Sequence, residues 1–349
     1  MTQDQNIFAL SNYYFDLPSN LIAQYPTKPR DEARLLVLNR STGSISDTSF
    51  KEITRFITPG DTLVLNKTRV IPARLWGKKL TGAKVEILLL RKIDDRWESL
   101  VKPARKLRAG DYVLFDKSEV RAEIIAEMSI PGGRIIRFDS CSDEQAFIEQ
   151  FGCMPLPPYI NREAQEEDRE DYQTVYAEVN GSAAAPTAGL HFTQELLKQI
   201  EDQGINIARV LLHVGLGTFR PVEKADIREH KMHSEFYVID NETAQLLNQT
   251  RKKGKSVIAV GTTVVRSLET VYNDDYGFLA QSGETDKFIY PGYKFRAVDK
   301  LVTNFHLPGS SLVMLVSAFA GIDQVKAAYK HAIDRQYKFF SYGDAMLII

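Results

Sequence analysis

The stretch INIARVLLHVGLG, residues 205–217, decides the fold more than any other segment. Its first ten residues are mostly apolar, which is typical of a strand buried on both faces of a parallel sheet. A second run of this kind, SVIAV at 256–260, also leads directly into a glycine, Gly261. Helices are expected before and between these strands, capped by Thr193 and by Asp240 or its neighbour. The alternation predicts a parallel or mixed α/β sheet covered by helices.

The middle of the chain has a different pattern. Between residues 62 and 138, short strand-like segments recur about every ten residues and are separated by turns such as Pro131-Gly132-Gly133. This spacing is typical of a compact β-barrel or sandwich. A short helix is expected over 143–151. The proline-rich run PLPPY, 155–159, follows it and predicts a hinge between the domains. Because strand and helix patterns also precede residue 62, the β-rich block is expected to be an insertion.

The length and charge of the chain limit the classes of protein. Its 349 residues are enough for two domains at about 150 residues each. Lys and Arg number 44 and Asp and Glu 45, so a nucleic acid would need a local basic patch rather than bulk charge. Residues 66–111 carry such a patch, with 13 Lys or Arg against 5 Asp or Glu. The alternative for this patch is an ordinary solvated surface.

The cysteines and apolar runs indicate the compartment. Cys141 and Cys153 are too few for a disulfide framework or an iron–sulfur cluster. The N-terminus lacks the pattern of a signal peptide, and the longest apolar stretch, 312–322, is about half of the roughly 20 residues that span a bilayer. We therefore expect a cytoplasmic protein without membrane association.

Five of the six histidines lie between residues 190 and 307, within glycine-punctuated segments. Two of the glycine turns follow expected strands, and ligands of open α/β sheets bind beyond the carboxyl ends of strands. The motifs GxGxxG, GxxxxGK[ST] and GxSxG are absent, which disfavours a nicotinamide enzyme, a nucleoside triphosphatase and a serine hydrolase. His230, His233 and Glu235 do not follow the helical zinc pattern, so no metal is expected.

The order of motifs along the chain resembles one family. The sequence contains PLPPYI, DYQTVYA, AAPTAGLHF, HVGLGTF, HKMHSEF, VGTTVVRSLE, TNFHLPGSSLVMLVSAFAG and FFSYGDAMLI, preceded by RLLVLNR and LVLNKTRVIPARL. These motifs are similar to those of the S-adenosylmethionine:tRNA ribosyltransferase-isomerase family of queuosine biosynthesis. The resemblance covers essentially the whole chain. It implies the fold class α/β, with a large α/β sandwich-type domain (1–61 and 153–349) and an inserted small β-barrel domain (62–152).

The resemblance also implies an activity. Such enzymes transfer and isomerise the ribosyl part of S-adenosylmethionine, a co-substrate, onto 7-aminomethyl-7-deazaguanine at the anticodon wobble position of tRNA. The products are epoxyqueuosine-tRNA, adenine and methionine. The partner would be the tRNA anticodon stem-loop, and a monomer is expected. The alternatives are an S-adenosylmethionine-dependent RNA methyltransferase, which would release S-adenosylhomocysteine, and a non-catalytic RNA-binding protein.

The implied reaction needs several proton transfers, which imidazole and carboxylate groups usually perform. We expect His191 and His306 nearest the reacting sugar, because their loops are rich in small residues. The alternative for each histidine is a structural hydrogen bond. The pool of candidates also contains His230 and, with Glu235 as the second carboxylate, Asp168. The catalytic set is His191, His306, His213, His233 and Glu235.

Other residues are expected to bind the two substrates. Phe192 and Phe219 could stack on adenine or face the sulfonium, and Arg266 could pair with the methionine carboxylate or form a surface ion pair. Ser310 is expected to cap a helix instead of touching a ligand. The set for S-adenosylmethionine is Thr187, Gly189, Phe192, Gly215, Gly217, Thr218, Phe219, Gly261, Thr262, Thr263 and Arg266. The set for RNA is Arg74, Lys102, Arg105, Lys106 and Arg108.

Overall fold

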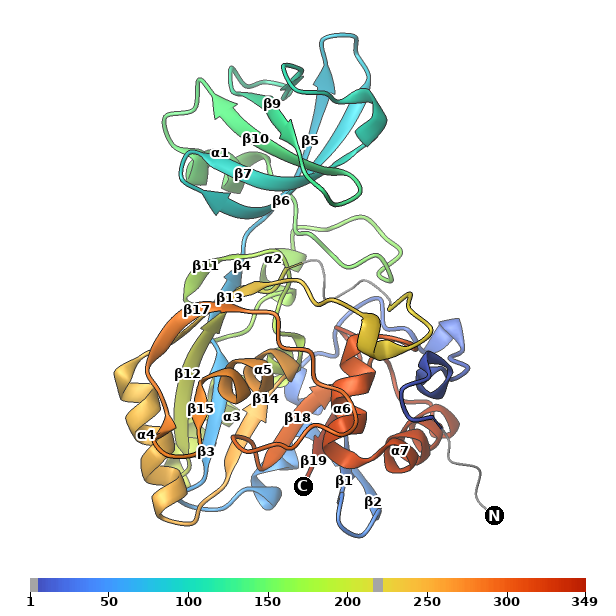
Figure 1. Ribbon diagram of the computed structural model, residues 1–349, viewed down its shortest axis with the longest axis vertical. Coiled ribbons are helices and arrows are strands. Elements are labelled where there is room, and N and C mark those ends of the chain that lie inside the picture. The colour runs from blue at the N-terminus through green and yellow to red at the C-terminus, as the bar shows by residue number, and fades with distance from the viewer. Residues whose placement is uncertain (1–5, 216–221) are drawn as a thin grey trace.

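The computed structural model describes residues 6–215 and 222–349. A large domain and a smaller barrel are stacked along the long axis of the molecule (Figure 1). Gly217, Thr218 and Phe219, which we expect to touch the ligand, lie outside the described residues.

The large domain is built on a nine-stranded sheet in the order β17-β13-β12-β3-β14-β18-β19-β1-β2. Strands β12, β3, β14 and β18 are parallel, and Val64 of β3 pairs with Ala208 on one side and Ala259 on the other. The sheet is mixed, as predicted, because β12 pairs antiparallel with β13 and β18 pairs antiparallel with β19. Its strands are β1 (Arg34–Leu38), β2 (Ile45–Ser49), β3 (Thr62–Asn66), β12 (Asn206–Leu212), β13 (Glu235–Ile239), β14 (Val257–Val260), β17 (Gln281–Thr285), β18 (Lys300–Asn304) and β19 (Ala345–Ile348).

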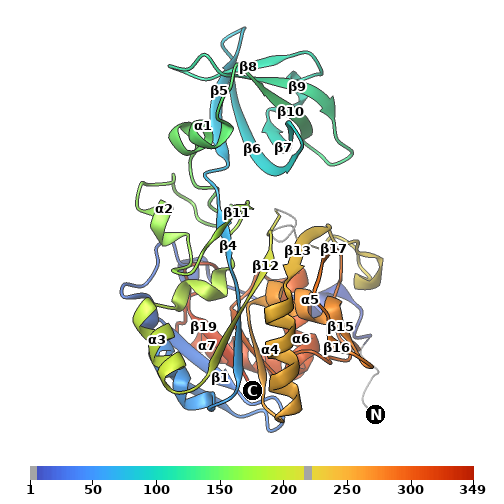
Figure 2. The ribbon, with the colours of Figure 1, turned by 90° about the vertical axis from the view of Figure 1, so that its left-hand side faces the viewer.

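Helices cover both faces of this sheet, because its central strands are apolar on both faces. In β3, Leu63 and Leu65 pack with one buried cluster and Val64 with another. Figure 2 shows α3 on one side of the sheet and α4, α5 and α6 on the other. The helices are α3 (Gln194–Asp202), α4 (Asn241–Lys252), α5 (Thr262–Val271), α6 (Ser311–Ala320) and α7 (Ile322–Asp334), and the 3-10 helix η4 (Phe50–Phe56) lies on the α3 side.

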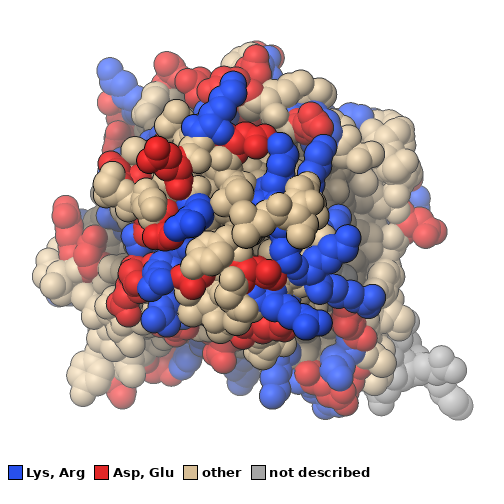
Figure 3. Space-filling model, turned by 90° about the horizontal axis from the view of Figure 1, so that it is seen from above, with Lys and Arg blue, Asp and Glu red and all other residues tan. Residues whose placement is uncertain are grey.

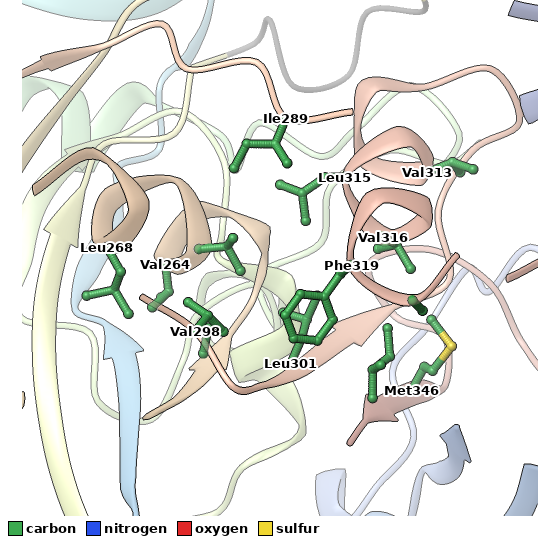
Figure 4. Packing of buried hydrophobic residues seen from close by; sticks show 14 of the residues in the cluster. Val264, Leu268, Ile289, Val298, Leu301, Val313, Leu315, Val316, Phe319 and Met346 are labelled. Carbon is green, nitrogen blue, oxygen red and sulfur yellow. The ribbon is translucent and has the colours of Figure 1, made fainter. Parts of the chain in front are cut away.

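The cluster that contains Val64 also holds two helices that matter for the site, α5 and α6. Val264 and Leu268 of α5 point toward Leu301 of β18, and Val316 and Phe319 of α6 close the other side (Figure 4). These side chains are almost fully buried. Since each buried leucine or valine stabilises the fold by about 1.5–3 kcal/mol, the two helices are held firmly against one face of the sheet.

The inserted domain is a closed six-stranded barrel in the order β10-β7-β6-β5-β8-β9. Helix α1 (Glu144–Phe151) is capped by Asp143 and packs Phe147 and Ile148 into the barrel core. The predicted small β-barrel is therefore confirmed. Its strands are β5 (Arg74–Lys79), β6 (Lys84–Ile93), β7 (Arg96–Lys102), β8 (Tyr112–Leu114), β9 (Arg121–Glu127) and β10 (Gly133–Asp139).

One strand was assigned to the wrong domain by the sequence pattern. Residues 62–66, expected to open the barrel, form β3 at the centre of the large sheet. All five residues are buried, as a strand covered on both faces requires. The next strand, β4 (Thr68–Val70), pairs with β11 (Val179–Ser182), and the barrel begins only at Arg74.

The connections between the two domains lie side by side. Backbone hydrogen bonds join Arg74 to Cys153, with N···O distances of 3.2 and 2.8 Å, where the chain enters and leaves the barrel. The proline-rich run 155–159 that follows contains neither helix nor strand. Within the described residues no single helix is long and apolar enough to cross a membrane; only α6 and α7 together, across a bend of 114°, would be.

Candidate active site

A small cavity lies where the parallel strands β12, β14 and β18 end, which is where ligands of such sheets bind. Its volume is about 60 Å³. The described residues that line it include no Lys, Arg, Asp or Glu, and most of its polar groups are hydroxyls. The lining residues are Tyr159, Ala185, Pro186, Thr187, Ala188, Val214, Gly261, Thr262, Thr263, Thr303, Asn304, Phe305, His306, Leu307, Ser310, Leu312, Phe340 and Ser341.

The loop between β14 and α5 supplies one wall of the cavity. Gly261 has a φ of +91°, a conformation that other residues rarely adopt, so the sharp turn into α5 depends on glycine. Thr262 and Thr263 follow it and line the cavity, as does Thr187. The structure thus brings together four of the residues expected to bind S-adenosylmethionine.

Asn304, at the last position of β18, is a cavity residue that the sequence analysis missed. Its Oδ1 accepts a hydrogen bond from Thr187 Oγ1 at 3.0 Å, and its Nδ2 donates to the Phe340 carbonyl at 3.3 Å. Nδ2 also lies 3.1 Å from Nε2 of His191. Its position could have been predicted, because a polar residue at the carboxyl end of an apolar strand lies where ligands of α/β sheets bind.

The two histidines expected nearest the sugar are both buried. Burial lowers the pKa of His306 to about 3, and burial with the nearby charge of Arg30 lowers that of His191 to about 4. His306 lines the cavity and its Nε2 is 2.7 Å from Thr303 Oγ1. His191 lies behind Asn304, against the ring of Phe50. Protonating either imidazole would place an uncompensated charge in the core, so both are weak bases near pH 7, which favours the structural alternative.

A larger hollow, of about 890 Å³, separates the barrel from the large domain. Val214 lines both this interdomain cleft and the cavity. The large domain contributes His213, Gly215, His233 and Glu235 to the cleft, and the barrel contributes β6 and β7 residues such as Trp97. Three of the expected catalytic side chains therefore face the cleft, while His306 faces the cavity.

His213 is held from three sides at the rim of the cleft. Its Nδ1 is 2.9 Å from Thr68 Oγ1, and its ring stacks on Phe236 with centroids 6.0 Å apart. A Cβ on Gly181 would come within 2.7 Å of the ring, so glycine is needed there. Burial lowers the pKa of this half-buried imidazole. His233 is exposed on the same lining.

Arg266 does not occupy the place expected of a methionine-carboxylate ligand. It is buried and forms an ion pair with Glu235, which is also buried. Its remaining nitrogens donate to the carbonyls of Lys287 and Thr285 at 3.0 and 3.1 Å. Glu235 in turn accepts from the amide of Gly215 at 2.8 Å. The pair therefore fixes the backbone at Gly215, and Arg266 is absent from the described lining of the cavity.

Two other expected ligand contacts are core residues. Phe192 is fully buried against Phe50, with ring centroids 4.9 Å apart, so its faces are not open to adenine. Gly189 allows close packing instead of ligand approach, because a Cβ there would lie 2.0 Å from the Tyr176 hydroxyl. Ser310 does cap α6, as predicted, through its Oγ and the amide of Val313.

The other candidates are also committed to contacts within the protein. Although burial favours protonation of Asp168, hydrogen bonds from Arg162 and Tyr342 hold its pKa below the usual range. His230 lies edge-on to Phe288, and burial lowers its pKa. In the part of the chain that the structure describes, no group of three His, Cys, Asp or Glu side chains could hold a metal ion.

Basic side chains gather on the barrel. The 3-10 helix η5 (Ala104–Lys106) and its flanks expose Lys102, Arg105, Lys106 and Arg108. Seen from the barrel end, Lys and Arg side chains cluster along one side, with Asp and Glu between them (Figure 3).

Two further arginines of the barrel are structural. The buried Arg134 holds the η5 loop by donating to the carbonyls of Leu107 and Ala104 at 2.9 and 2.7 Å. Arg74, expected to bind RNA, is half-buried at the domain junction. It pairs with Glu86 and donates to the Leu156 carbonyl at 3.2 Å, so its position does not favour a role in binding phosphate.

The family of queuosine biosynthesis proteins matches residues 10–348, and the chain belongs to this family. It is 59% identical over 349 residues to the S-adenosylmethionine:tRNA ribosyltransferase-isomerase of Syntrophomonas wolfei, covering 99% of both chains. The protein of the same name from Staphylococcus haemolyticus is 54% identical over 342 residues, covering 97% of this chain and 99% of that one.

A solved structure gives the same result for the fold. The crystal structure of S-adenosylmethionine tRNA ribosyltransferase from Thermotoga maritima is 40% identical, with a TM-score of 0.56. The match covers 97% of this chain and all of that one. The resemblance inferred from the motifs is thereby confirmed.

Proposed function

We propose that this protein transfers the ribosyl part of S-adenosylmethionine to the aminomethyl group of 7-aminomethyl-7-deazaguanine in tRNA and isomerises it, giving epoxyqueuosine-tRNA, adenine and methionine. The observation that carries the proposal is the adjacency of two hollows in a member of the queuosine biosynthesis family: a hydroxyl-lined cavity whose described lining has no charged side chain, and an imidazole-bearing cleft. The names of the similar proteins support the same reaction.

The sizes of the two hollows suggest how the substrates divide between them. A single water needs about 10–15 Å³ on this scale, so the cavity of about 60 Å³ accommodates a group of a few atoms. We assign it to the methionyl end of S-adenosylmethionine. The sugar then lies near Val214, and the cleft receives the acceptor base, which must leave the anticodon stack to be read.

The proton transfers are assigned to the cleft. The acceptor ammonium must lose a proton before it attacks, and the ribosyl 5′-carbon, acidified by the sulfonium, must lose another. His213 and His233 are the imidazoles on the cleft lining and are our candidates for these steps. Glu235, held by its ion pair with Arg266, fixes the backbone at Gly215. We assign His191 and His306 to positioning Asn304 and Thr303.

The tRNA backbone is assigned to the outside of the barrel. Among the described residues, the cleft lining carries six Asp or Glu against two Lys or Arg, which is unfavourable for phosphates. The exposed Lys102, Arg105, Lys106 and Arg108 offer charges that release counterions from RNA. We propose that they contact the anticodon stem-loop, and that the protein acts in the cytoplasm as a monomer with no metal.

One assay separates this function from its alternatives. The purified protein is incubated with ribose-labelled S-adenosylmethionine and tRNA carrying the aminomethyl base. We expect release of adenine and methionine and transfer of label to tRNA. A methyltransferase would instead produce S-adenosylhomocysteine, and a non-catalytic RNA-binding protein would leave S-adenosylmethionine intact.

A further inference from the structure

We propose that the N-terminus of α5, together with the hydroxyl of Thr263, forms the subsite that binds the α-carboxylate of S-adenosylmethionine. The inference rests on the proposed function and sharpens it, because it replaces Arg266 with a different anion-binding group. Helix α5 has ten residues, and its N-terminus lies at the wall of the cavity.

The first observation is that the amides at the start of α5 lack acceptors. Gly261, the N-cap, has no side chain to accept a hydrogen bond, and its own amide donates to Val302 at 2.8 Å. Among the described residues, no group accepts from the backbone amides of Thr262, Thr263 or Val264. Unpaired amides and the helix dipole together attract an anion to such an end.

The second observation is independent of the helix geometry. Thr263 is 7% exposed, and its Oγ1 has no hydrogen-bond partner among the described residues. Buried hydroxyls are almost always paired, because leaving one unpaired costs about 1–3 kcal/mol. The residue lines the cavity, so an acceptor placed there would satisfy the hydroxyl.

Helix α6, which also begins at this cavity, shows what a satisfied N-terminus looks like. Ser310 Oγ accepts from the amide of Val313 and donates to the Leu307 carbonyl at 2.7 Å. The chain therefore caps α6 with its own side chain, whereas the start of α5 has no such cap. This difference selects α5, not α6, for a ligand.

The charge of the cavity agrees with this choice. Its described lining contains neither an Asp or Glu that would repel an anion nor a Lys or Arg that would compete for it. Arg266, the cation on α5 itself, is neutralised by Glu235. Of the oxygens of S-adenosylmethionine, only those of the carboxylate carry a full charge, so this group gains most from the helix end.

The test compares the binding of S-adenosylmethionine with that of its decarboxylated analogue by calorimetry. The wild type should bind the carboxylated compound more tightly. Thr263→Val keeps the side-chain shape but removes the hydroxyl, and should weaken S-adenosylmethionine binding about 10- to 100-fold while sparing the analogue. Thr263→Ser should restore most of the affinity.

Thr270→Val is the matched control, because its hydroxyl lies near the other end of α5 and is satisfied by Arg266 and Thr285. It should leave both affinities unchanged. Equal binding of the two compounds by the wild type, or equal weakening of both in Thr263→Val, would overturn the subsite alone. If the wild type bound neither compound, the proposed function would fail as well, and adenine release measured in parallel reports that failure separately.

Discussion

The cavity beside α5 and the cleft between the domains share Val214 as a wall, yet their histidines have different surroundings. In and behind the cavity, burial lowers the pKa of His306 to about 3 and that of His191 to about 4. On the cleft, His213 is half-buried and His233 exposed. The difference teaches that histidines of neighbouring motifs can divide into a buried group and a group that solvent and substrates can reach.

The largest expected effect is the loss of turnover when His213, on the lining of the cleft, is replaced. Replacing His213 by Gln keeps a polar group near Thr68 but removes the imidazole, and turnover should fall at least about 100-fold, as for a lost acid or base. S-adenosylmethionine binding should change little. The measurement is single-turnover adenine release. His331→Gln is the control, since His331 pairs with Asp47 and lines neither hollow. Near-normal turnover of the His213 variant would remove this residue from the mechanism.

A substitution in the cavity should affect the binding of S-adenosylmethionine more than turnover. Asn304→Ala removes the partner of Thr187 and His191, so KM for S-adenosylmethionine should rise about 10-fold or more, with a smaller change in kcat. Steady-state kinetics separates the two parameters. Asn248→Ala, which removes hydrogen bonds to Phe278 far from the cavity, should lower stability without raising KM. An unchanged KM for Asn304→Ala would mean that the cavity does not bind the donor.

Substitutions on the surface of the barrel test whether the tRNA phosphates bind outside the cavity and the cleft. Replacing Arg105 and Lys106 by Ala should weaken tRNA binding and make the slope of log K against log salt shallower by about 1–2, because two phosphate contacts are lost. S-adenosylmethionine binding should stay the same. The measurement is a salt titration of tRNA affinity. An unaltered slope would place the RNA on another surface.

The smallest expected effect concerns stability and pH. The folded protein keeps His306 neutral down to about pH 3, whereas an unfolded chain takes up a proton near 6.5. Between these values the unfolded state binds more protons, so stability should fall as pH decreases. His306→Asn should lose less of its Tm than the wild type when the pH is lowered from about 7.5 to about 5. Equal losses would show that the buried imidazole makes no such contribution.

The sequence predicted features that depend on local order. The alternation of strands and helices after residue 193 predicted the mixed sheet, and the strands recurring about every ten residues predicted the barrel. Thr193, Asp240 and Ser310 cap helices as expected. It failed for residues 62–66, because a five-residue segment with three apolar residues does not say which distant strands it will pair with.

The site was predictable only in part, for a similar reason. Arg266 and Glu235 are 31 residues apart, and nothing local shows that they neutralise each other. Phe192 and Gly189 stand in a motif that touches the site, but their own environment is the core. Membership of a motif indicates proximity to the site, and only packing decides which side chains face it.

The dependence of single-turnover adenine release on pH, at saturating S-adenosylmethionine and tRNA, tests most directly whether the cleft performs the chemistry. We predict a rate that falls as the pH is lowered from about 7 to about 5, because protonation of His213, whose pKa burial lowers, removes the base, and a loss of that fall in His213→Gln. A rate that stays constant over this range and falls only toward the pKa values of about 3 and 4 of His306 and His191 would contradict the account.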